Sequence, residues 1–90
     1  MKMKVLSVFD SAAQAFGRPA FVAAIGSAIR SFTDEVNRVD ADNQMNQHPS
    51  DFTLYELGEF DDEHGRFTML DTPRVLARAQ DVKILRPEEC

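Results

Sequence analysis

The segment from Phe52 to Leu70 most constrains how this chain can fold, because its pattern is typical of a β-hairpin. Phe52 to Phe60 is rich in aromatic and β-branched residues, as strands are. Asp61 to Gly65 (DDEHG) is a charged turn whose glycine can adopt a positive φ, and Arg66 to Leu70 returns as the second strand. Any fold of this chain is therefore expected to contain an antiparallel strand pair here.

Pairing Phe60 with Arg66 across the turn predicts which side chains of the hairpin share a face. The face expected to be on the core side holds Tyr55, Leu57, Phe67 and Met69. The opposite face holds Glu56, Gly58, Phe60, Arg66 and Thr68. A register shift of one residue would change this assignment.

The N-terminal half predicts one strand and one long helix. Lys2 to Phe9 (KMKVLSVF) is short and rich in strand-forming residues. Asp10 to Arg18 is predicted to be a loop, with room for one helical turn. From Pro19 to Val36, apolar residues recur at steps of three and four, and proline is tolerated at a first helical position. We therefore expect an amphipathic helix over 19–36.

The C-terminal half adds a long polar connection and two short elements. Asn37 to Ser50 has no periodicity and is longer than most connections, so it is either a mobile loop or a functional one. Thr72 followed by Pro73 has the pattern of a helix start, and the apolar residues up to Ala79 predict a short helix. Asp81 to Leu85 is predicted to be a final strand.

These elements predict an α+β fold of the order β-α-β-β-α-β, a ferredoxin-like sandwich with both helices on one sheet face. If the last strand is absent, the alternative is β-α-β-β-α with an open sheet edge. Ninety residues are enough for one domain. We assign residues 1–86 to a single α+β domain and residues 87–90 to an acidic C-terminal tail.

The charges are unevenly distributed along the chain. The net charge is −5, yet none of the ten lysines and arginines lies in residues 39–65, which hold eight of the fifteen acidic residues. If the fold brings the two ends of the chain together, a weakly basic face can exist beside an acidic edge. Without such a face, an acidic protein is a poor ligand for phosphate.

Several classes of site have no support in the sequence. Cys90 is the only cysteine, which excludes an internal disulfide and a multi-cysteine zinc site. Phosphate-binding glycine motifs and an activated serine are absent, and Asp61 to His64 is more typical of a charged turn than of a metal site. We expect no enzymatic activity, no cofactor and no bound metal. The lack of a long apolar stretch or a secretory signal favours the cytoplasm.

A sheet covered by helices on one side only leaves a face on which aromatic rings can stack with bases while cations contact the backbone. The predicted nucleic-acid-binding residues are Lys4, Phe52, Phe60, Arg66, Arg74 and Arg78, with Lys2 nearby. The alternative is that Phe52 and Phe60 complete the core or lie in a homodimer contact.

Three segments resemble one viral family over about residues 1–83: MKMKVLSVFDS, AIRSFTDEVN and HPSDFTLYELGEFDDEHGRFTMLDTPRVLARAQD. The chain is similar to the small nonstructural protein of gokushovirus-type microviruses, which are single-stranded DNA phages. The resemblance implies a DNA-binding protein of the host bacterial cytoplasm. It also implies a role in the change from double-stranded replication to single-stranded genome synthesis.

The function expected from these observations is non-enzymatic binding of single-stranded DNA, with the protein acting as a homodimer. The rival is an acidic regulator that binds the phage replication initiator or a capsid precursor through residues 40–63 rather than DNA. A third alternative, a metal-dependent nuclease, requires metal-dependent cleavage of DNA.

Overall fold

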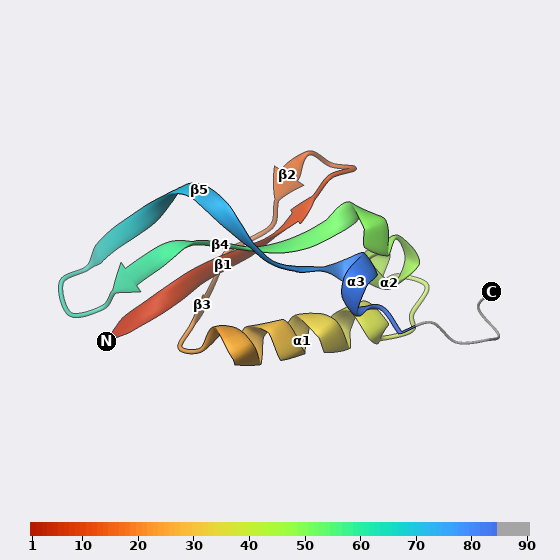
Figure 1. Ribbon diagram of the computed structural model, residues 1–90, viewed down its shortest axis with the longest axis horizontal. Coiled ribbons are helices and arrows are strands. Elements are labelled where there is room, and N and C mark those ends of the chain that lie inside the picture. The colour runs from red at the N-terminus through yellow and green to blue at the C-terminus, as the bar shows by residue number, and fades with distance from the viewer. Residues whose placement is uncertain (85–90) are drawn as a thin grey trace.

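The computed structural model describes residues 1–84 and shows an antiparallel β-sheet with helices packed on one side (Figure 1). The strands are β1 (Lys2–Asp10), β2 (Ala15–Phe16), β3 (Ala20–Val22), β4 (Phe52–Asp61) and β5 (Arg66–Arg78). The helices are α1 (Ile25–Asn37), α2 (Gln44–Gln47), the 3-10 turn η1 (Pro49–Asp51) and α3 (Ala79–Val82). None of the helices described is long and apolar enough to cross a membrane.

The two long strands β1 and β4 form the centre of the sheet. The strand order is β2-β1-β4-β5, and β3 pairs with β1 on the same edge as β2. Within residues 1–84, β5 therefore forms the opposite edge, which has no further strand beside it. All pairs are antiparallel.

The core lies between α1 and one face of the sheet. Phe32 and Val36, on the C-terminal half of α1, are buried against Leu6 of β1 and Leu54 of β4. Ala79, the first residue of α3, closes this cluster. We call this side of the sheet the helix face.

An extra residue in β4 changes which side chains point to the helix face. Val5 lies opposite Gly58, but the next residue, Leu6, lies opposite Glu56, so Leu57 is a β-bulge. Side chains alternate along each strand, and the bulge shifts that alternation by one residue. Leu54, Glu56 and Glu59 consequently all lie opposite residues of β1 on the helix face.

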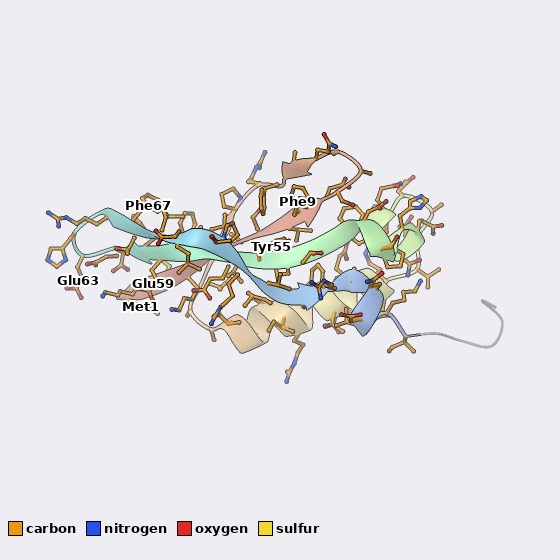
Figure 2. The ribbon with its side chains drawn as sticks, turned by 45° about the horizontal axis from the view of Figure 1, so that its top comes forward. Met1, Phe9, Tyr55, Glu59, Glu63 and Phe67 are labelled. Atoms are coloured by element: carbon orange, nitrogen blue, oxygen red, sulfur yellow. The ribbon has the colours of Figure 1, made fainter. Side chains whose placement is uncertain are left out.

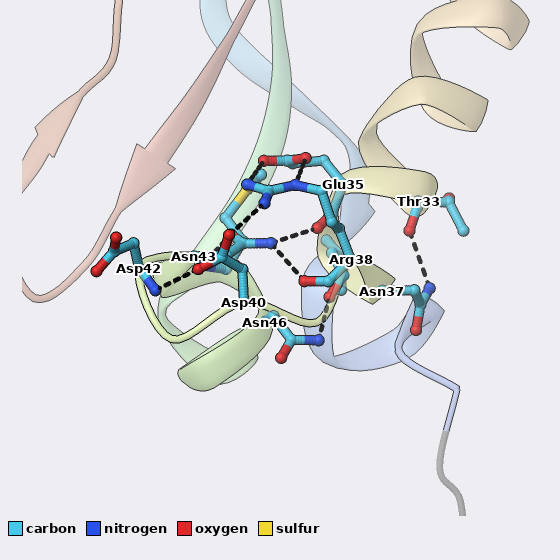
Figure 3. A network of polar contacts seen from close by, with 10 residues as sticks. Thr33, Glu35, Asn37, Arg38, Asp40, Asp42, Asn43 and Asn46 are labelled. Atoms are coloured by element: carbon cyan, nitrogen blue, oxygen red, sulfur yellow. Dashed lines mark hydrogen bonds and ion pairs between the residues drawn. The ribbon is translucent and has the colours of Figure 1, made fainter.

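The long polar connection after α1 is held by a hydrogen-bond network (Figure 3). The side-chain amide of Asn43 donates to the carbonyls of Glu35 and Arg38, and that of Asn46 donates to the carbonyl of Val36. Both asparagines are buried. They donate to carbonyls at and just after the C-terminal end of α1, of which that of Glu35 also accepts from the N–H of Arg38, so this segment anchors the end of the helix.

The helix predicted over 19–36 begins later than expected. The predicted helix is confirmed from Ile25 onward as α1, but Ala20–Val22 is strand β3, and the predicted loop 10–18 contains β2. Pro19 precedes the edge strand β3 instead of a helix. Proline is tolerated at the start of an edge strand, because its missing N–H is not needed for pairing there.

The helix predicted from Thr72 is wrong, because β5 continues through this region to Arg78. The pairing is irregular between Glu56 and Gly58, where residues 70–73 of β5 lie opposite Leu57 alone. Proline is tolerated at such a position in an edge strand.

The final strand predicted over 81–85 is also wrong in its described part, since Asp81 and Val82 lie in α3. Leu85 and the predicted tail, 87–90, lie outside the described residues. The α+β class is confirmed, with an antiparallel sheet as in a ferredoxin-like fold. In residues 1–84 the order of elements differs both from β-α-β-β-α-β and from the alternative β-α-β-β-α, because three strands precede α1 and β5 replaces the second predicted helix. Only the open edge of the alternative, here at β5, is found in these residues.

The predicted hairpin is confirmed, with a register one residue from that expected. Gly65 has a φ of 63° in the turn. Asp61 pairs with Arg66, and Phe60 pairs with Phe67 rather than Arg66. The predicted division of the hairpin into two faces therefore fails at Phe60.

Candidate functional site

The side of the sheet opposite α1 carries a group of aromatic side chains, which we call the aromatic face. It consists of Phe9, Phe16, Phe21, Tyr55, Phe60 and Phe67. These are five of the seven phenylalanines and the single tyrosine of the chain. Such a concentration on one face makes this the candidate functional site.

The strand register explains how these rings come together. Tyr55 lies opposite Ser7 and Phe60 lies opposite Met3, and both β1 residues point away from the helix face. Phe21 of β3 lies opposite Val5, so it points to the same side. The two short edge strands thus extend the aromatic face beyond β1.

The rings form two clusters along the sheet. In the first, the Phe9 and Phe16 ring centroids are 4.9 Å apart, and Phe16 and Tyr55 are 5.5 Å apart. In the second, Phe60 and Phe67 are 4.7 Å apart and Phe21 and Phe60 are 5.6 Å apart. Aromatic rings attract one another in tilted and edge-on contacts at these distances, so the contacts stabilise each cluster.

Both clusters are open to solvent. Phe16, Phe21 and Phe67 are 44%, 46% and 56% exposed, and Met69 and Val75 on β5 are also exposed. Figure 2 shows Phe67 and Phe9 on one side of the sheet and Glu59 and Met1 on the other. An exposed apolar surface of this kind marks an interaction site in a small protein.

Two of the six predicted binding residues lie on the aromatic face. Phe60 is part of the second cluster. Arg78 pairs with Thr53, which lies opposite Phe9, so Arg78 is at the end of the face near the first cluster. Arg78 is exposed.

The other four predicted residues lie elsewhere. Phe52 packs against the core cluster. In the strand register, Lys4 lies opposite Glu59. Arg66 and Arg74 lie opposite Asp61 and Glu56. All of these positions are on the helix side of the sheet. Lys2, opposite Asp61, is on that side too. The predicted gathering of these cations beside Phe60 is therefore wrong.

Carboxylates hold two of these cations on the helix side. Glu56 is 4% exposed and forms ion pairs with Arg74 and, at 3.8 Å, with Lys4. Lys4 also pairs with Glu59, and this hydrogen bond raises the pKa of Lys4. These charges crosslink β1, β4 and β5 and are poorly placed to receive a phosphate.

The tip of the hairpin is acidic. Asp62 and Glu63 lie 2.7 and 3.2 Å from the N-terminal ammonium of Met1, and Asp61 contacts His64 at 2.8 Å. Among residues 1–84, no three histidine, cysteine or acidic side chains are grouped so that they could hold a metal ion.

Acid is expected to weaken the fold through the hairpin carboxylates. The hydrogen bond from Lys4 lowers the pKa of Glu59 below its ordinary 4.5, and the contact with His64 lowers that of Asp61 below 3.8. A carboxyl whose pKa is lower in the folded state stabilises the protein above its unfolded pKa and loses that contribution as pH falls through the folded value.

Urea unfolding between about pH 7 and pH 3 tests this expectation. The free energy of unfolding should stay level down to about pH 5 and then fall. The decline should be smaller in Glu59→Gln, which cannot be protonated. An equal decline in this variant would show that Glu59 makes no contribution.

The sequence reasoning missed Phe9, Phe16, Phe21, Tyr55 and Phe67 as binding residues. Phe67 and Tyr55 were expected on one face, which is correct, but as part of the core. Phe16 and Phe21 were expected in a loop and a helix. One signal in the sequence could have found them. The chain has seven phenylalanines and one tyrosine, more aromatic rings than one long helix can bury against the sheet.

Comparison with known proteins identifies a family for this chain. Searches of curated proteins and of solved structures each found no match. The family model described as Phage ORF5 protein matches residues 3–82, which include β1 from Met3 onward, all other strands, α1 and the whole aromatic face. The chain therefore belongs to the Phage ORF5 protein family.

Proposed function

We propose that this phage protein is a non-enzymatic single-stranded DNA-binding protein that stacks bases on its aromatic face. The observation that carries the proposal is the exposure of Phe16, Phe21 and Phe67 on a sheet face that no helix of residues 1–84 covers. Stacking of one base on an aromatic ring contributes about 1–3 kcal/mol and tolerates any sequence. In duplex DNA, base pairing and stacking keep the flat faces of the bases out of reach.

The charge arrangement favours stacking over phosphate contacts as the source of affinity. Of the predicted cations, Arg78 alone lies on the aromatic face, while Lys4 and Arg74 are paired with carboxylates. Each neutralised phosphate of a single strand steepens the salt dependence by about 0.7 logarithmic units. We therefore expect a shallow salt dependence, with about one phosphate contact per protomer.

The biological role follows from the resemblance to the microvirus nonstructural protein. A protein that covers newly made single strands in the host cytoplasm removes them as templates for complementary synthesis. This is the role we propose in the change from double-stranded replication to single-stranded genome synthesis.

Titration of a fluorescent oligothymidylate tests the proposal. We expect Phe67→Ala to weaken binding about 5- to 150-fold, the equivalent of one lost stacking contact. Because this ring is 56% exposed, its removal should leave the fold intact. Arg78→Ala should weaken binding and flatten the salt dependence. Arg66→Ala, an exposed cation on the opposite face, is the matched control and should bind normally.

Absence of binding by the wild-type protein, or unchanged binding by Phe67→Ala, would refute the proposal. The aromatic face has one competing occupant, a second copy of the chain. If light scattering shows a dimer that Phe67→Ala converts to a monomer while DNA binding is unaffected, the aromatic face is a dimer interface.

A second candidate function is a regulator that binds a basic partner, such as the phage replication initiator or a capsid precursor. The favouring observation is the exposed pair Asp62 and Glu63 at the tip of the hairpin. Neutralising both, by Asp62→Asn and Glu63→Gln, distinguishes the two functions. Tighter DNA binding supports the first candidate, and loss of the partner supports the second.

A further inference from the structure

A groove on the helix side of the sheet is separate from the aromatic face. It lies between α1 and the edge formed by β1 and β3 and has a volume of about 490 Å³. Sites for small organic molecules typically measure about 300–1,000 Å³ and are mostly apolar with a few polar groups. The groove matches both properties.

Small side chains of β3, of the connection after it and of the start of α1 leave this space open. Ala20, Ala23, Ala24 and Ala28 line the groove next to Leu6 and Leu54 of the sheet. Farther along the same helix, Phe32 and Val36 fill the corresponding space and form the core. The space between the start of α1 and the sheet is therefore not filled by side chains of residues 1–84.

The polar groups of the groove include one cation. Arg18 belongs to the lining, is exposed, and forms no ion pair with any residue of the described part of the chain. Ser27 and Ser31 add hydroxyl groups from α1. The hydroxyl of Ser7 is already engaged, since it donates to the carbonyl of Gly17 at 2.7 Å.

We propose that this groove binds an amphiphilic anion, a molecule with an apolar chain and a single negative head group, of which a fatty acid is the simplest example. The alkyl chain lies against the alanines and leucines, and the head group pairs with Arg18. The unpaired positive charge selects an anionic head over a neutral or cationic one. The proposal does not depend on DNA binding.

The size of the groove favours a small molecule over a protein segment. A stable protein interface buries about 800 Å² on each partner, with 20 to 30 residues on each side. The groove is lined by a three-residue strand, part of α1 and few residues of the sheet. An apolar helix from another protein is the rival occupant.

Calorimetric titration with laurate, below its micelle concentration, tests the proposal. We expect saturable binding of one laurate per chain, and weaker binding of dodecanol and dodecyltrimethylammonium. Arg18→Gln should reduce laurate affinity at least fivefold and leave dodecanol affinity unchanged. Ala24→Ile should weaken binding of both by filling the groove, and Ala41→Leu, an exposed alanine outside the groove, should have no effect.

The position of the ligand is read from amide shifts in NMR spectra. Shifts centred on the groove lining, that is on the β3 segment, the first half of α1 and Leu6 to Val8 of β1, support the proposal. Shifts centred on Phe16 and Phe67 would place laurate on the aromatic face and overturn it, as would laurate binding that Arg18→Gln does not change. Binding of an apolar peptide without binding of laurate would also overturn it.

Discussion

Replacement of Phe32 by alanine is expected to lower the free energy of unfolding by about 3–5 kcal/mol. Phe32 is 5% exposed and joins α1 to Leu6 and Leu54 of the sheet. Truncation removes apolar contact area and leaves a cavity that the surrounding strands cannot fill by small movements. A small domain has a total stability of only about 5–15 kcal/mol, so this loss is a large share of it.

Urea denaturation followed by circular dichroism measures the effect. Val39→Ala is the matched control, since Val39 is 66% exposed and its loss should change stability by less than about 0.5 kcal/mol. If Phe32→Ala does not fold, Phe32→Leu keeps the test available with a smaller loss. A loss below about 1 kcal/mol for Phe32→Ala would contradict the proposed core.

The second large effect is expected at Gly58. A Cβ atom there would lie 2.5 Å from the carbonyl oxygen of Thr68 and 2.7 Å from the Cα of Met69. Both are backbone atoms of β5, so the strands would have to separate. We expect Gly58→Ala to cost about 1–3 kcal/mol, and Gly58→Val more.

Gly26 provides a control of opposite sign. A Cβ atom there meets nothing within 4 Å, and the residue lies in α1. Gly26→Ala should therefore raise the free energy of unfolding by about 0.4–1 kcal/mol, because alanine restricts the unfolded chain and favours the helix. Equal effects of the two substitutions would mean that helix and strand preferences, rather than the approach of β5 to β4, govern Gly58.

Local chemistry in the sequence was sufficient for the hairpin and for most of α1. The turn DDEHG lies between two strand-like segments, and its glycine takes the positive φ that the turn requires. The spacing of Ile25, Phe32 and Val36 follows the period of a helix, and the last two are buried as expected. These signals depend only on neighbours in the chain.

The two misassigned prolines show the limit of local signals. Pro19 and Pro73 each follow a pattern compatible with a helix start, yet β3 begins immediately after the first and β5 contains the second. Proline has no backbone N–H, and neither the first position of a helix nor the outer side of an edge strand requires one. Both positions therefore accept proline. The choice depends on where the strand lies in the sheet, which is a tertiary property.

The candidate site was recovered only in part for a related reason. Phe60 and Arg78 were identified, but assembling the site also requires β2 and β3, which are two and three residues long. Such strands form because β1 is there to pair with them, and their own sequences carry little signal. Arg66 was misplaced because the hairpin register, which sets the faces, was off by one residue, and Arg74 was misplaced because the predicted helix around it is part of β5.

The extra residue Leu57 has a consequence for the whole upper surface of the molecule. Tyr55 and Phe60 are five positions apart, an odd number, and in an unbroken strand they would project in opposite directions. The insertion puts the two halves of β4 out of phase, and this brings both rings to one side. If Leu57 were instead paired in the ladder of a regular strand of the same length, Phe60 would turn toward the charged underside, and one continuous aromatic surface would be split into two unrelated fragments.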